Sequence, residues 1–123
     1  MTNDVPVIVI TGNMGAGKTT ILAEASDLLT GAAIVHAAID LDTLGMGHVP
    51  EEGWSDLPYR NLACVWHNYA AAGASRLMVA EALESGRDID RIQQAVPGAE
   101  IIVCRLSATP AHAATAPRDR LSE

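Results

Sequence analysis

The segment from Gly12 to Thr19 has the residue types and spacing best suited to chemistry in this chain. It reads Gly-Asn-Met-Gly-Ala-Gly-Lys-Thr and fits the phosphate-binding pattern G-x-x-x-x-G-K-[ST] at every fixed position. Its glycines allow positive φ angles and close approach of backbone N–H groups to an anion. Lys18, the only lysine among 123 residues, is expected to reach the β- and γ-phosphates, and the Thr19 hydroxyl to ligate Mg²⁺. We therefore predict nucleotide binding by Gly12, Asn13, Met14, Gly15, Ala16, Gly17, Lys18, Thr19 and Thr20.

A strand and a helix must flank such a loop for the pattern to have this meaning. Residues 5–11 form a short, apolar, β-branched run that is typical of a buried parallel strand. Residues 18–29 carry apolar side chains at helical spacing, and Thr30-Gly31 predicts the end of that helix. The alternative is a glycine-rich turn that only caps a helix, but a cap requires neither the lysine nor the threonine.

The rest of the chain alternates predicted strands with predicted helices, which indicates an α/β fold with a parallel sheet and helices on both faces. We expect a nucleotide-binding domain over residues 1–106 and a weakly ordered tail over residues 107–123. Residues 43–58 contain several Gly and Pro without periodicity and predict a long functional loop. The predicted strands are 33–39, 77–80 and 100–106, and the predicted helices are 60–72 and 85–95, the latter starting with a capping box of Ser85 and Asp88.

Several carboxylates follow the predicted strands directly. Asp40 and Asp42 follow the second strand, and ligands of open parallel sheets bind at the carboxyl ends of the strands. We predict that Asp40 takes the proton of a substrate hydroxyl or holds Mg²⁺ through water, with Asp42 contacting the substrate; the alternative is that they only cap the next turn. Glu81 follows the third strand as either a Walker-B type carboxylate or a solvated charge, and Glu84 has a weaker claim.

Other polar and aromatic side chains have less specific interpretations. Arg60 is expected either to pair with an anionic substrate group or to lie on the surface. Trp66 and Tyr69 share the apolar face of a helix and are expected in the core, as are the reduced cysteines Cys64 and Cys104. No metal-ligand spacing relates the histidines, which are His36, His48, His67 and His112.

Composition restricts the partners and the compartment. The net charge is −7, and no basic run is present, which argues against nucleic acid or an anionic membrane as the main partner. No apolar stretch is long enough to span a membrane, and the acidic start shows no signal peptide, so we expect a cytoplasmic protein. Asp42-Thr43-Leu44-Gly45 matches D-x-x-G, but a GTPase also needs N-K-x-D, which a chain whose single lysine is Lys18 does not contain.

With the loop, Asp40 and the segment starting at Arg60 in place, the sequence resembles the P-loop kinases of small molecules, such as chloramphenicol phosphotransferase, adenylylsulfate kinase and gluconate kinase. The resemblance covers residues 5–106 and implies strand order 2-3-1-4, with a fifth strand expected to be missing here. It implies transfer of the ATP γ-phosphoryl group to a small hydroxyl-bearing molecule, with Mg²⁺ bound at Thr19, Lys18 and Asp40 as catalytic residues, and Arg60 as a substrate contact.

These kinases continue after the fourth strand into a lid helix that carries arginines. The corresponding tail of this chain contains only Arg118 and Arg120 in an Ala/Pro-rich segment. Because a catalytic arginine is worth roughly 10³–10⁵ in rate, we expect slow turnover. The alternatives are a non-catalytic ATP-binding module that requires a partner chain and, less favoured, an ATPase switch; an unfinished sheet edge also predicts pairing into a homo-oligomer.

Overall fold

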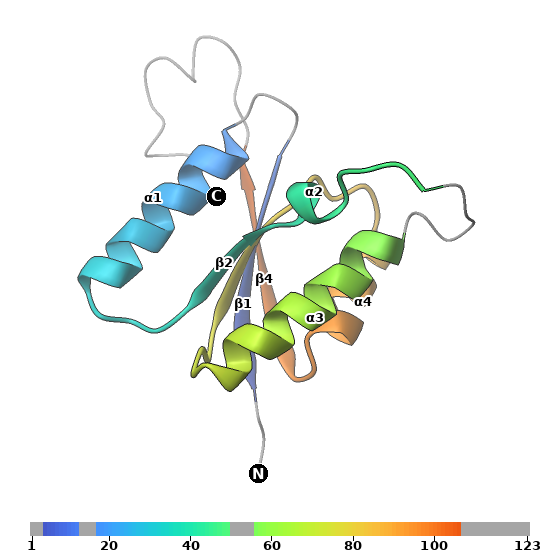
Figure 1. Cartoon of the computed structure of the whole chain (residues 1–123). Coiled ribbons are helices and arrows are strands. Elements are labelled where there is room, and N and C mark those ends of the chain that lie inside the picture. The colour runs from blue at the N-terminus through green and yellow to red at the C-terminus, as the bar shows by residue number, and fades with distance from the viewer. Residues whose placement is uncertain (1–3, 13–16, 50–55, 107–123) are drawn as a thin grey trace, which may run out of the picture.

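The sheet is central to the computed structural model, which describes residues 4–12, 17–49 and 56–106. Four parallel strands lie in the order β2-β3-β1-β4, as predicted (Figure 1). The register pairs Val9 of β1 with Val79 of β3 and with Val103 of β4. The strands are β1 (Val5–Gly12), β2 (Ala37–Asp40), β3 (Leu77–Ala80) and β4 (Ala99–Leu106).

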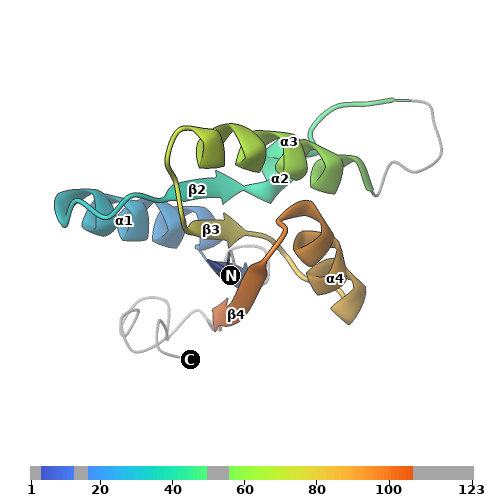
Figure 2. The same ribbon diagram turned by 90° about the horizontal axis from the view of Figure 1, so that it is seen from below.

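Helix α1 (Lys18–Gly31) covers one face of this sheet, and the smaller of two apolar clusters lies beneath it (Figure 2). Leu22 is the one buried residue of the helix, and Leu28 is exposed. The cluster consists of Ile10, Leu22, Met78, Ala80 and Leu106. This packing fixes α1 against the ends of β1 and β3, so the first turn of the helix lies where β1 ends.

Helices α3 (Leu57–Ala71) and α4 (Gly86–Ala95) cover the opposite face, where the larger core lies. Leu62 of α3 and Ile92 of α4 are completely buried against the strands. Trp66 is buried, which confirms the prediction for it. Because apolar surface removed from water contributes about 25 cal/mol per Å², this larger cluster stabilises the packing of α3 and α4 on the sheet.

Some element boundaries differ from the predicted ones. Strand β2 begins at Ala37 instead of Ala33 because Ala33 adopts φ 58° and residues 33–34 bond back to the last carbonyls of α1. Helix α3 begins at Leu57, ahead of the predicted start, because Pro58 occupies its first turn, where an N–H has no partner in the helix. The start of the predicted loop contains a short helix, α2 (Leu41–Leu44), for which Asp40 is the N-cap.

Two predicted core residues lie at the surface instead. Tyr69 is 43% exposed and Cys64 is exposed, so the core prediction was wrong for both. The buried residues of α3 are Leu62 and Trp66, so its buried stripe is narrower than its apolar composition suggests. Cys104 is half-buried on β4.

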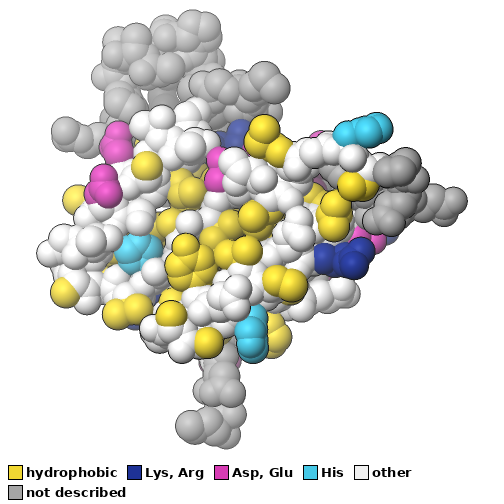
Figure 3. All heavy atoms as spheres, viewed as in Figure 1, with side chains coloured by type: hydrophobic (Ala, Val, Ile, Leu, Met, Phe, Trp, Pro, Cys, Tyr) yellow, Lys and Arg dark blue, Asp and Glu magenta, His cyan; other side chains and the backbone are white. Residues whose placement is uncertain are grey.

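The molecular surface has no broad basic patch on the face drawn in Figure 3, where Lys and Arg side chains appear singly and hydrophobic side chains gather between α1 and α3. Among the described helices, none combines the length and the apolar character needed to cross a membrane. On the inner strand β1 and the edge strand β4, the paired residues Ile8 and Ile102 are both exposed.

Candidate functional site

The predicted phosphate loop connects the end of β1 to the start of α1. Gly12 is the last residue of β1, and Gly17 is the N-cap of α1 with φ 87°, a left-handed conformation that favours glycine. The Lys18 ammonium donates a hydrogen bond to the Gly12 carbonyl oxygen at 3.1 Å, so the lysine side chain turns back along the loop. Thr20 is exposed in the first turn of α1, and residues 13–16 lie outside the described residues.

Asp40, the last residue of β2, is hydrogen-bonded to the first turn of α1. The Thr19 hydroxyl donates to Asp40 Oδ2 at 3.1 Å, and the Asp42 backbone N–H donates to Asp40 Oδ1 at 3.0 Å. Asp40 therefore caps α2 and also contacts the residue that follows Lys18. The alternative interpretation as a cap is correct, and it coexists with the placement beside the loop that the sequence predicted.

A hydroxyl oxygen beside a carboxylate oxygen suits Mg²⁺, which binds oxygen ligands and usually takes only one or two carboxylates together with substrate phosphates. Thr19 and Asp40 together offer this donor set at the start of α1. These two residues thus fit the ion that the loop motif implies.

The segment after β3 is fixed against β1 by two hydrogen bonds. The Glu81 N–H donates to the Ile10 carbonyl at 2.9 Å, and the Leu83 N–H donates to the Thr11 hydroxyl at 2.9 Å. Thr11 is buried, so its hydroxyl oxygen accepts this hydrogen bond out of contact with solvent. These bonds place Glu81 next to the strand that leads into the phosphate loop.

Glu81 itself is buried, with 6% of its surface exposed. The Tyr59 hydroxyl donates a hydrogen bond to Oε2, whereas Oε1 has no partner within the described part of the chain. Burial raises the pKa of Glu81 to about 7; the nearby Asp88 and Asp42 add to the rise, while Tyr59 and Arg91 lower it. The expectation of a solvated charge was therefore wrong, and Glu84 is the exposed carboxylate of this segment.

A polar network from α3 and α4 surrounds Glu81. Asp88 completes the predicted capping box of α4 with Ser85 and accepts a hydrogen bond from Arg91 at 3.2 Å. Arg91 also pairs with Asp56 at 3.2 Å and stacks over the Tyr59 ring, 5.5 Å from its centre. Burial and the Glu81 carboxylate raise the pKa of Tyr59, so its hydroxyl remains a donor at physiological pH.

This network borders a cavity of about 290 Å³ at the carboxyl ends of β2 and β3. Asp42, for which the sequence predicts a contact with the substrate, lines this cavity. The sequence analysis missed Tyr59 and Arg91, although Tyr59 directly follows the Pro58 that starts α3. The cavity is lined by Leu41, Asp42, Gly45, Pro58, Tyr59, Glu81, Ala82, Glu84, Asp88 and Arg91.

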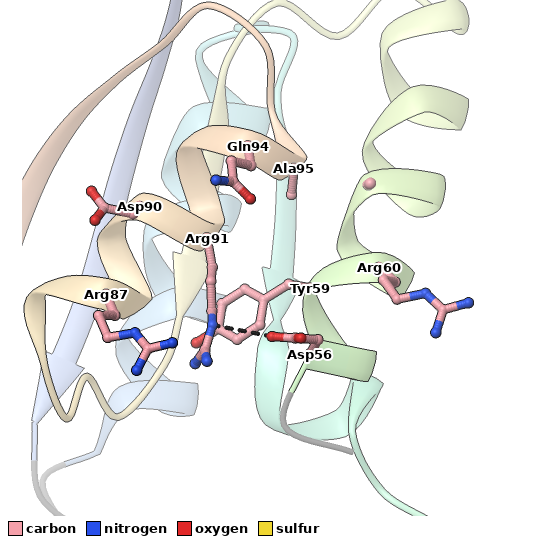
Figure 4. A pocket seen from close by; sticks show the side chains of 9 residues that line it. Asp56, Tyr59, Arg60, Arg87, Asp90, Arg91, Gln94 and Ala95 are labelled. Atoms are coloured by element: carbon pink, nitrogen blue, oxygen red, sulfur yellow. Dashed lines mark ion pairs between the residues drawn. The ribbon is translucent and has the colours of Figure 1, made fainter. Parts of the chain in front are cut away.

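A second cavity of about 580 Å³ lies between α3 and α4 (Figure 4). Arg60 borders this cavity and not the one beside Asp42. In Figure 4 the Arg60 side chain points away from Arg91 and Tyr59, and Arg60 is exposed. The structure thus brings Lys18, Thr19 and Asp40 together but leaves Arg60 outside that group.

The described histidines, which are His36, His48 and His67, belong to no group of ligands that could hold a metal ion. His36 bonds to the Ser26 hydroxyl at 2.7 Å and to the Ile34 carbonyl at 2.8 Å, which explains it as a structural residue. His48 and His67 are exposed, and His112 lies outside the described residues. Within residues 4–12, 17–49 and 56–106, no group of three or more His, Cys, Asp or Glu is arranged to hold a metal ion by itself.

Comparison with solved structures shows which architecture this is. The chain superposes on the protein APE1195 with a TM-score of 0.65 at 19% identity, over 89% of this chain and 67% of the other. It also matches a sugar kinase from Janibacter sp. HTCC2649 (TM-score 0.57, 20% identity, 98% and 67% covered). An APS kinase of Mycobacterium tuberculosis matches as well (TM-score 0.53, 18% identity, 87% and 81% covered). The chain has a P-loop kinase-like fold.

The fold is shared without detectable similarity at the level of sequence families. No model of a protein family matches the sequence, and no curated protein matches it. At identities of about one residue in five, the structural likeness shows the fold alone. The chemistry of this chain is therefore inferred from its own residues.

Proposed function

We propose that this protein is an ATP- and Mg²⁺-dependent phosphotransferase that acts on a hydroxyl group of a small molecule. The observation that carries the proposal is the contact between Thr19 and Asp40, which brings the residue after the motif lysine to the end of the second strand. A kinase needs a phosphate-binding cation, a magnesium ligand and a proton acceptor close together. Lys18, Thr19 and Asp40 are the three residues that would supply these functions.

Lys18 would exchange its bond to the Gly12 carbonyl for the phosphates of ATP. The Gly12 carbonyl holds the Lys18 ammonium within reach of the loop. Breaking this hydrogen bond costs little free energy, because the new hydrogen bonds are to charged phosphate oxygens. The first turn of α1 adds its unpaired N–H groups and about half of a positive charge to the same place. Together they would stabilise the negative charge that the γ-phosphoryl group carries during transfer.

Asp40 would receive the proton of the acceptor hydroxyl. As the oxygen–phosphorus bond to the acceptor forms, the bond between the γ-phosphorus and the bridging oxygen breaks, and ADP leaves. Asp40 Oδ1 is held by the Asp42 N–H, so the carboxylate has a fixed orientation, and Oδ2 faces Thr19. A positioned base of this kind typically contributes about 10²–10⁴-fold to the rate.

The test separates binding from transfer. We expect Lys18→Ala to weaken ATP–Mg²⁺ binding by titration calorimetry while the circular dichroism spectrum stays unchanged. Asp40→Asn should retain binding but lose about 10²–10⁴-fold of phosphoryl transfer, measured with labelled ATP and a metabolite mixture. Arg76→Ala is the control, because this exposed arginine precedes β3 at the opposite end of the sheet.

Two results would contradict the proposal. Equal ATP affinity in wild-type protein and Lys18→Ala would remove the role of the loop, and ATP binding without transfer to any metabolite would support a non-catalytic nucleotide-binding module instead.

The proposal also includes a nucleotide-binding domain over residues 1–106 with a separate tail over residues 107–123, which lies outside the described residues. It includes a cytoplasmic location, where ATP is available.

A further inference from the structure

The cavity beside Asp42 is strongly acidic, and the one arginine among the described residues that line it is already paired. Four carboxylates line it, from Asp42, Glu81, Glu84 and Asp88, against the single guanidinium of Arg91. Arg91 is held by Asp88 and by Asp56, each at 3.2 Å. An anionic ligand would therefore find no free positive charge among the residues that line this cavity.

Asp88 is also fully engaged within the protein. Its Oδ2 accepts the N–H groups of Glu84 at 2.8 Å and Ser85 at 3.4 Å, and its Oδ1 accepts from Arg91. Asp88 therefore completes the start of α4 and has little capacity left for a ligand. Asp42 and Glu84 are exposed and add negative charge near the opening.

Glu81 differs from these neighbours because one of its oxygens has no partner. The side chain is 94% buried, Oε2 accepts from Tyr59, and Oε1 makes no hydrogen bond to any described residue. An acceptor that is buried and unsatisfied destabilises the folded protein, more so when it is charged, and is normally explained by a ligand or a water molecule. Here the orphan oxygen belongs to a residue that lines an open cavity next to the proposed transfer site.

We propose that this cavity binds a protonated amine on the phosphoryl acceptor, with Glu81 Oε1 accepting its N–H and Asp42 and Glu84 supplying further negative charge. The acceptor is then a small amine that also carries a hydroxyl group. That the bound amine is the phosphoryl acceptor rests on the proposed function. The amine site itself depends only on the residues that line the cavity.

Charge explains why an ammonium group fits better than a neutral hydroxyl or an anion. Each added carboxylate makes the cavity more attractive to a cation, and the low polarity around a buried group strengthens this attraction. Within the described residues no group of three or more His, Cys, Asp or Glu is arranged to hold a metal ion by itself, and the occupant that we infer is an organic cation. An ammonium would also favour the ionised form of Glu81, which burial alone disfavours.

The experiment uses three probes of equal size and different charge, without ATP. Ethanolamine carries an ammonium, ethylene glycol is neutral and glycolate is anionic, and all three are small enough for the cavity. Each is titrated into the whole protein at about pH 8, above the pKa of Glu81, while the Glu81 side-chain carboxyl carbon is followed by NMR. We expect ethanolamine to bind at least about tenfold more tightly than ethylene glycol, as for a hydrogen bond to a charged group, and glycolate not to bind.

A pH titration and two variants complete the design. Saturating ethanolamine should lower the apparent pKa of Glu81 in the wild-type protein. Glu81→Gln should lose the preference for ethanolamine, whereas Glu24→Gln, an exposed carboxylate on α1, should retain it. An unchanged Glu81 signal with ethanolamine, or equal binding of all three probes, would overturn the amine site.

The two proposals fail in distinguishable ways. Loss of the amine site would leave ATP binding at Lys18 untouched, because no nucleotide is present in the titration. Conversely, ethanolamine binding in a protein that does not bind ATP would keep the amine site and remove the kinase.

Discussion

Replacing Glu81 by Gln should make the protein more stable at neutral and alkaline pH. The side chain is buried and shares one oxygen with Tyr59, while the negative charges of Asp88 and Asp42 oppose its ionisation and Arg91 favours it. Its pKa rises from 4.5 to about 7 as a result. Glutamine has almost the same shape, can still accept from the Tyr59 hydroxyl, and carries no charge at any pH.

The size and sign of the effect follow from proton linkage. The folded protein holds the Glu81 proton more tightly than the unfolded chain does, so this contribution is fully present below pH 4.5 and is lost as pH rises to about 7. At 1.36 kcal/mol for each unit of pKa, the rise corresponds to about 3 kcal/mol in the free energy of unfolding. Glu81→Gln should therefore match the wild-type protein near the acid limit and exceed its stability by about 3 kcal/mol above pH 7.

Urea unfolding followed by circular dichroism, repeated across this pH range, measures the difference. Glu24→Gln provides the control, because an exposed carboxylate on α1 should change stability little and without this pH profile. A stability difference between Glu81→Gln and wild type that stays constant with pH would refute the reasoning about Glu81.

Two further changes test the packing and the capping. Leu62→Ala removes a completely buried side chain from the α3 layer and should cost about 2–5 kcal/mol in urea unfolding; the exposed Leu28→Ala should cost far less, and similar losses at both sites would contradict the assigned core. Ser85→Ala removes the cap of α4 and should cost about 0.5–2 kcal/mol. The exposed Ser75→Ala is its control, and an equal effect of the two would argue against the capping box.

The sequence predicted most of the fold because its strong signals are local. The apolar run before Gly12, the motif up to Thr19, and the capping box at Ser85 each depend on neighbouring residues. The order of the four strands followed from the resemblance to the P-loop kinases of small molecules. The position of Asp40 beside the loop helix followed from the rule that ligands of open parallel sheets bind at the carboxyl ends of the strands.

The features that the sequence did not reveal depend on contacts between distant residues. Glu81 is buried and accepts a hydrogen bond from Tyr59, 22 positions earlier, and no local sequence pattern predicts a contact between residues so far apart. Tyr69 shares helical spacing with Trp66, yet it is exposed, because only Leu62 and Trp66 of α3 are buried. Ala33 looked like part of a strand, since its positive φ is invisible in an apolar sequence.

The central position of β1 has a consequence for how the chain is made. Both neighbours of β1 come later in the sequence, because it pairs with β3 from Leu77 onward and with β4 from Ala99 onward. At about 5–20 residues per second, a ribosome needs several seconds between completing β1 and completing β3. During synthesis the apolar segment that leads into the phosphate loop therefore waits with both of its edges unpaired, and an unpaired apolar strand can pair with another chain.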